Sequence, residues 1–182
     1  MQQPPPFELI EYTHTKHRAV LEQWWKNEKV VKFVGPLDKQ LTDMQEKTET
    51  DPERGRRIHR PTLRWLAQDV NTGQPVGYVS VQVSGQGGSE GKASPVTPPF
   101  HGGVNIVVDP DAEPSGYGTA IVRALFREPT LADVETLGGS VDVTNTASLG
   151  MLRKLGVTKY TERKRSDGKV FRDFVFPRPC TQ

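Results

Sequence analysis

The feature that most constrains this chain is the stretch VVDPDAEPSGYGTAIVRALF, residues 107–126. An apolar run stops at Asp109-Pro110, and a polar loop then leads through Gly116-Tyr117-Gly118 into a segment with helical patterning. The start of a helix leaves backbone N–H groups without partners, and glycines let an anion approach them closely. The stretch therefore predicts a strand, a turn and a helix, with the turn acting either as a phosphate seat or only as a flexible corner.

Composition indicates one compact domain. The 182 residues are 34% hydrophobic, and the net charge of +2 gives no electrostatic case for a nucleic-acid or membrane partner. The single cysteine, Cys180, cannot form an internal disulfide, and no apolar run is long enough to span a bilayer. We therefore expect a cytoplasmic domain over residues 7–177, with a flexible lead at 1–6, a mobile loop at 84–100 and a tail at 178–182.

Local patterns predict a mixed α/β domain with the order β-α-α-β-β-β-α-β-α-β-β. Alternating or short apolar runs indicate strands at residues 7–12, 63–70, 76–83, 104–108, 139–143, 159–164 and 170–176. Helical spacing indicates helices at residues 16–27 with Thr15 as the cap, 41–49, 117–126 and 147–155.

A second segment, SVDVTNTASLGMLRKLGV (residues 140–157), places an asparagine after a strand, a serine three residues later and Lys-x-Gly at the helix end. The two segments together resemble the Gcn5-related N-acetyltransferase (GNAT) superfamily, most closely its ribosomal-protein N-terminal acetyltransferases. WWKNEKVVKFVG and VRALFREP are similar to segments of aminoglycoside 6′-N-acetyltransferases and siderophore lysine acetyltransferases. The resemblance implies a mostly antiparallel sheet of six to seven strands, with a parallel splayed pair and helices on both faces.

The resemblance also implies acetyl-coenzyme A (acetyl-CoA) as co-substrate, bound at the splayed strands, and no metal. The pantetheine arm would pair with the backbone of Ile106, Val107 and Val108. The pyrophosphate would be held by the backbone amides of Ser115, Gly116, Tyr117, Gly118 and Thr119. Asn145 would hydrogen-bond the pantetheine amides, and Ser148 would lie close to the thioester.

The chain departs from the family pattern at three positions. Glu113 stands where glutamine or arginine is usual, and a carboxylate near a pyrophosphate is unfavourable. Leu152 stands where many relatives carry the tyrosine that protonates the leaving thiolate, so Ser148 or a water remains as the acid. Gly103 stands where many relatives carry an early carboxylate.

The general base therefore has two candidates, Asp142 at a strand end and His101 at a strand entrance. An amine is mostly protonated at neutral pH, so its attack needs a proton acceptor or a chain of waters. Asp142 can equally cap a turn, and for His101 a solvated loop position is favoured over a catalytic one.

In this family the first two helices and the loop before the cofactor strand line the acceptor site. That points to Trp24, Trp25 and Phe33, although adjacent tryptophans on a helix face different directions and core positions are the alternative. The acceptor would be a primary amine of a small molecule or a protein N-terminus. A homodimer and a monomer both remain open.

Two other classes of function stay open. The departures at Glu113, Gly103 and Leu152 suit an acyl-CoA sensor that no longer catalyses. The basic segment ERGRRIHR (residues 53–60) could bind nucleic acid, or it could be an ordinary solvated face. His14 and His17 stand three residues apart, but without a further ligand they make no metal site.

Overall fold

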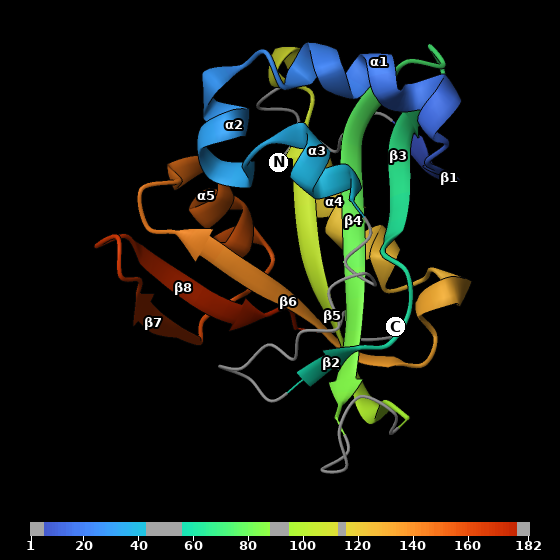
Figure 1. Ribbon diagram of the computed structural model, residues 1–182. Coiled ribbons are helices and arrows are strands. Elements are labelled where there is room, and N and C mark those ends of the chain that lie inside the picture. The colour runs from blue at the N-terminus through green and yellow to red at the C-terminus, as the bar shows by residue number, and fades with distance from the viewer. Residues whose placement is uncertain (1–5, 43–55, 88–94, 113–115, 178–182) are drawn as a thin grey trace.

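A single eight-stranded sheet organises the protein, which is shown in Figure 1 as a computed structural model. The structure describes residues 6–42, 56–87, 95–112 and 116–177. Its strands are β1 (Phe7–Glu11), β2 (Arg56–Ile58), β3 (Leu63–Asp69), β4 (Pro75–Gln86), β5 (Thr97–Val108), β6 (Val134–Asp142), β7 (Tyr160–Lys164) and β8 (Val170–Val175). The order across the sheet is β1-β3-β4-β5-β6-β8-β7, with β2 paired to β4. β5 and β6 form the parallel pair, and the other pairs are antiparallel.

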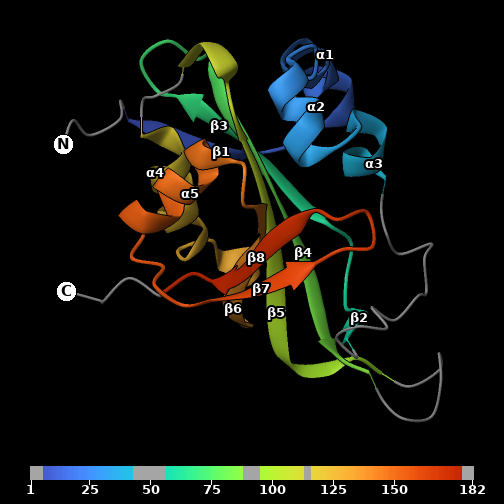
Figure 2. The same ribbon diagram turned by 90° about the vertical axis from the view of Figure 1, so that its left-hand side faces the viewer.

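Helices cover both faces of this sheet (Figure 2). One face carries α1 (His14–Trp24), α2 (Glu28–Val34) and α3 (Leu37–Leu41), and the other carries α4 (Tyr117–Leu125) and α5 (Thr146–Lys154). Two short 3₁₀ helices, η2 (Pro110–Ala112) and η3 (Pro129–Leu131), flank α4. The expected mixed α/β fold is confirmed, and the short β2 is an addition to the expected strands.

The strand alternation of β4 builds a core on each side of the sheet. Val79 and Val81 are fully buried on the side of α4, where they join a cluster with Ile121. Tyr78, the neighbour of Val79 along β4, is 1% exposed and packs with Leu21 on the side of α1. Because successive side chains of a strand point to opposite faces, one apolar strand supplies both cores.

The segment expected to be a mobile loop at residues 84–100 is partly strand, which corrects that expectation. β4 continues to Gln86 and β5 begins at Thr97, and these two residues are paired in register. The proline- and glycine-rich composition indicated a loop, but pairing along β4 holds this part of β5 extended. Residues 88–94 lie outside the described ranges.

The helices at the N-terminal end also differ from expectation. Helix α1 begins after Thr13 rather than Thr15. α2 and α3 occupy residues for which no helix was expected, and the glycine of Gly35-Pro36 separates them with a φ of 91°. The helix expected at residues 41–49 falls largely on residues that are not described, as do the lead at 1–5 and the tail at 178–182.

Truncating Val122 should destabilise the fold, because this α4 side chain is fully buried. We expect Val122→Ala to lower the free energy of unfolding by about 2 kcal/mol. The matched control is Val31→Ala on α2, whose side chain is 43% exposed, with a loss below about 0.5 kcal/mol. Equal losses for the two variants in urea denaturation would contradict the placement of α4 against the sheet.

Candidate active site

The two parallel strands separate part of the way along their length. β5 pairs with β6 from Phe100–Val134 to Gly103–Gly138, and beyond this point β5 continues only along β4. At the separation a Cβ added to Gly139 would lie 3.1 Å from the Val104 carbonyl oxygen. The strands thus diverge just after a close contact, which leaves a splay at residues 104–108 of β5.

The backbone of β5 presents two residues to this splay. The Asp109 N–H donates to the Val76 carbonyl of β4 at 3.0 Å, and the Val107 carbonyl oxygen would lie 3.4 Å from a Cβ added to Gly77 of β4. Because successive backbone groups of a strand point to opposite neighbours, those of Ile106 and Val108 face away from β4. Of the three residues expected to pair with the pantetheine arm, Val107 is therefore engaged with β4, and its side chain is buried.

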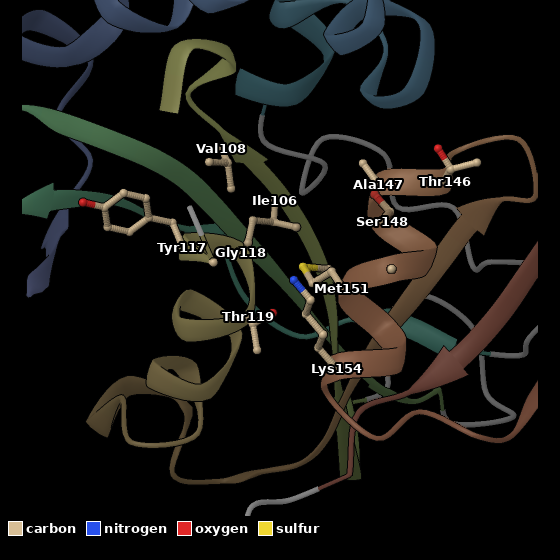
Figure 3. Close-up of a pocket in the computed structure, with 12 residues that line it drawn as sticks. Ile106, Val108, Tyr117, Gly118, Thr119, Thr146, Ala147, Ser148, Met151 and Lys154 are labelled. Atoms are coloured by element: carbon tan, nitrogen blue, oxygen red, sulfur yellow. The ribbon is translucent and has the colours of Figure 1, made fainter. Parts of the chain in front are cut away.

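A cleft of about 310 Å³ opens from the splay between α4 and α5 (Figure 3). It is lined by Ile106, Val108, Gly116, Tyr117, Gly118, Thr119, Thr146, Ala147, Ser148, Gly150, Met151 and Lys154. The structure thus brings together most of the expected cofactor residues. Ser115 and Glu113 lie outside the described residues.

The N-terminus of α4 faces this cleft without a side-chain cap. Gly116 precedes the helix with a φ of 83°, a conformation that favours glycine, and no acidic residue lies in the first turn. The α5 helix differs, since the Ser148 N–H donates to Asn145 Oδ1 at 3.1 Å. Among the described residues no side chain caps the first N–H groups of α4, and the helix dipole favours an anion at this end.

A second cavity of about 80 Å³ adjoins the cleft within the splay, between α2 and β6. Phe33, Asn105, Asp142 and Asn145 line it, as do several apolar residues of β5, β6, α5 and β8. The two cavities share Ile106, Ser148 and Met151. Ser148 thus stands where two ligands entering from different sides would meet.

Asp142 lines the second cavity, but its carboxylate is engaged in a turn. Its Oδ1 accepts the Thr144 N–H at 2.8 Å and the Thr144 hydroxyl at 2.7 Å. The Thr144 backbone donor, followed by its hydroxyl, lowers the pKa of Asp142 below its ordinary value. A lowered pKa makes a carboxylate a weaker proton acceptor, so the contacts favour the turn-capping alternative over a general base.

His101 is not brought to the site. It lies in the closed part of the β5–β6 pair, opposite Thr136, and its Nδ1 is 2.7 Å from the Thr136 hydroxyl. The residue lines neither of the two cavities. The expectation of a base at His101 is therefore not supported by its position.

The three aromatic residues expected at the acceptor site divide into two groups. Trp24 and Trp25 are 6% and 8% exposed and belong to the core beneath α1. The Trp25 indole N–H donates to the Gly35 carbonyl at 2.8 Å, which fixes the break between α2 and α3. Phe33 lines the second cavity. The structure places the two tryptophans in the core and only Phe33 beside the site.

Sequence reasoning missed Lys154 and Met151. Both line the cleft, and Lys154 is the one charged side chain among its described lining residues. Figure 3 shows it reaching from α5 toward α4. A signal was present: Ser148, Met151 and Lys154 follow one another at intervals of three, which places neighbours on one helix face.

The basic segment at residues 53–60 is partly used for structure. Arg60 forms an ion pair with Asp133 at 2.8 Å, and residues 53–55 are not described.

Among the described ranges there is no group of three or more potential metal ligands. Within the same ranges no helix has the length and apolar character needed to cross a membrane.

Comparisons with known proteins agree with this geometry. A family model of the acetyltransferase (GNAT) domain matches residues 7–158. The aminoglycoside acetyltransferase AAC(6')-Ib in complex with coenzyme A has a TM-score of 0.64 at 20% identity, with 95% of each chain covered. The ribosomal-protein-S18-alanine N-acetyltransferase from Escherichia coli has a TM-score of 0.60 at 17% identity, with 97% of each chain covered. Spermidine N-acetyltransferase from Vibrio cholerae with CoA and spermine has a TM-score of 0.62 at 9% identity and covers 93% of this chain and 94% of its own. No curated protein matches the chain.

The turn at Asp142 predicts a pH-dependent contribution to stability. Because the pKa of Asp142 is lowered in the folded state, its stabilising effect is full above the unfolded-state pKa, about 3.9, and is lost as the pH falls through the folded-state pKa. We expect Asp142→Asn to have a lower free energy of unfolding than wild type at pH 7. This gap in unfolding free energy should close toward pH 3. Thr144→Val, which keeps the N–H donor, should show a smaller gap. A gap that is constant across this range in urea denaturation would contradict the assignment.

Proposed function

This chain belongs to the acetyltransferase (GNAT) domain family, and from this premise we propose that it transfers the acetyl group of acetyl-CoA to a primary amine. The observation that carries the proposal is the splay of β5 and β6 beside the uncapped N-terminus of α4. The splay suits the amide-containing arm of the cofactor, and the N-terminus of α4 suits its phosphates. The proposed compartment is the cytoplasm.

The residues of the cleft offer groups that suit two parts of CoA, the pantetheine arm and the pyrophosphate. Ile106 and Val108 direct backbone N–H and C=O groups into the splay, where an amide-containing arm can pair with them as an added strand would. The amides of Tyr117, Gly118 and Thr119 face the position of the pyrophosphate. Gly118 lets the start of α4 lie close to Met151 of α5, because a Cβ there would lie 3.0 Å from Met151 Sδ.

Acetyl-CoA supplies an activated acetyl thioester when it is bound. The residues shared by the two cavities, Ile106 and Ser148 among them, would surround the reacting carbon. Holding amine and thioester in one place makes the reaction effectively unimolecular. The Val108 N–H, which faces the splay, is our candidate for stabilising the negative charge that develops on the thioester oxygen.

Proton transfer has fewer candidates than cofactor binding. Leu152 lines the second cavity and offers no proton, and among the described lining residues Ser148 is the one with a hydroxyl that lines both cavities. Asp142 is held in its turn by Thr144 and serves better to fix the cavity wall than to accept a proton. We infer that the amine loses its proton to water held by polar groups of the second cavity, Asn105 among them.

The acceptor enters, in this proposal, beside Phe33 and reaches Ser148 through the second cavity. A volume of about 80 Å³ admits an amino group on a narrow arm but not a whole large ligand. A small-molecule amine and a protein N-terminus both meet this requirement. The neighbours named above include a structure with spermine and an alanine N-acetyltransferase, so both kinds of acceptor belong in the assay.

The test has two parts. Calorimetric titration with acetyl-CoA should show saturable binding, and the absence of binding at high micromolar cofactor would refute the proposal. Thiol release should then be followed over a panel of aminoglycosides, polyamines and peptides with free N-termini. If acetyl-CoA binds but none of the amines in the panel causes thiol release, the acyl-CoA sensor is favoured instead.

Lys154 should contribute to cofactor affinity through its charge. It is the one charged residue among the described lining of the cleft, and the phosphates of CoA are anionic. We expect Lys154→Gln to weaken CoA binding about fivefold at low salt, with a smaller effect at high salt because ions screen the pair. Lys154→Arg should stay near wild type.

The matched control is Lys159→Gln, since Lys159 is an exposed lysine that does not line the cleft. It should leave the dissociation constant unchanged. If Lys159→Gln weakened binding as much as Lys154→Gln, the effect would reflect net charge alone and the role of Lys154 would be wrong.

A further inference from the structure

The side chain of Tyr117 leaves the cleft that its backbone lines. Figure 3 shows the ring directed away from α5, and the residue is 4% exposed within the core. Its ring meets Phe7 of β1 edge to face, with 6.1 Å between centroids. Its hydroxyl donates to Asp69 Oδ2 at 3.0 Å.

Asp69 is itself fixed at the end of β3. The residue is 7% exposed, and its other oxygen, Oδ1, accepts the N–H groups of Asn71 at 2.8 Å and Thr72 at 2.9 Å. These bonds form the turn between β3 and β4. The carboxylate therefore has one oxygen in a rigid hairpin turn and the other on the first residue of α4.

The directions in which the pKa values of Asp69 and Tyr117 are shifted agree with the hydrogen bond between them. The Thr72 backbone N–H is the largest of the contacts that lower the pKa of Asp69. Burial, and then the bond to Asp69, raises the pKa of Tyr117. At neutral pH an ionised carboxylate thus accepts from a neutral phenol, and hydrogen bonds to charged groups are the stronger kind.

Within the described start of α4, at residues 116–118, the side chain of Tyr117 is the one that can tie the helix to the sheet. Of Gly116, Tyr117 and Gly118, only the tyrosine has a side chain, and α4 has no side-chain cap. Ile121 and Leu125 are fully buried and hold the later turns of the helix. The position of the first N–H groups relative to β5 therefore depends on Tyr117.

We propose that Asp69 and Tyr117 are positioning residues for the pyrophosphate of CoA, which they hold in place by fixing the first turn of α4 to the β3–β4 hairpin. The inference rests on the proposed function, because it assumes that the α4 N-terminus receives the phosphates. Neither side chain touches the ligand; both act through the backbone amides of Tyr117, Gly118 and Thr119.

The test compares two ligands, CoA and pantetheine, which lacks the pyrophosphate. Tyr117→Phe removes only the hydroxyl and keeps the ring against Phe7. We expect it to raise the dissociation constant of CoA roughly tenfold and to leave that of pantetheine unchanged in an NMR titration. The matched control is Tyr160→Phe, because Tyr160 is 50% exposed on β7 and lines no part of the cleft.

Each outcome decides the question. CoA binding by Tyr117→Phe within twofold of wild type, or equal weakening of both ligands, would overturn the inference. If Tyr117→Phe does not fold, Asp69→Ser is measured in its place, since a serine hydroxyl can accept from the turn but is too short to hold Tyr117 as well; unchanged CoA binding by that variant would also overturn the inference. Failure of wild type to bind CoA would instead refute the proposed function itself.

Discussion

The site depends on the point at which β5 stops pairing with β6. Up to Gly103–Gly138 the strands form a parallel pair, with a register shift between Phe100 and His101, and beyond it each continues along its antiparallel neighbour. β5 therefore keeps its geometry through β4 while one side of its backbone loses its partner. Unpaired backbone groups inside a sheet need a substitute, and a ligand that carries amides can provide it.

The elements around the splay convert this opening into two connected cavities. α4 and α5 close one side and bring the uncapped helix start, Ser148 and Lys154 to the cleft. α2 closes the other side and brings Phe33 to the smaller cavity. In the proposed function, the two cavities therefore offer more groups that suit a cofactor than groups that could move protons. Leu152 is apolar, and Asp142 is committed to Thr144.

Sequence patterns predicted the parts of the fold that have strong local signals. The strand before Asp109, the helix from Tyr117 and the helix after Asn145 were all expected, because apolar periodicity, glycines and a capping residue mark them. The extension of β5 to Thr97 was not, because its prolines and glycines favour a loop until pairing with β4 is known. Likewise, no local pattern relates Asp69 to Tyr117, whose bond joins residues 48 apart in the chain. Asp142 and His101 were both candidates for the general base, and their contacts and their positions relative to the second cavity separate them.

The central claim is that the splay and the start of α4 together hold CoA. The most direct measurement is an NMR titration with CoA that follows the backbone amides of Ile106, Val108, Gly118 and Thr119. The account predicts that these four amides shift together and saturate at one dissociation constant. Saturable binding that leaves them unchanged and shifts amides elsewhere would contradict it.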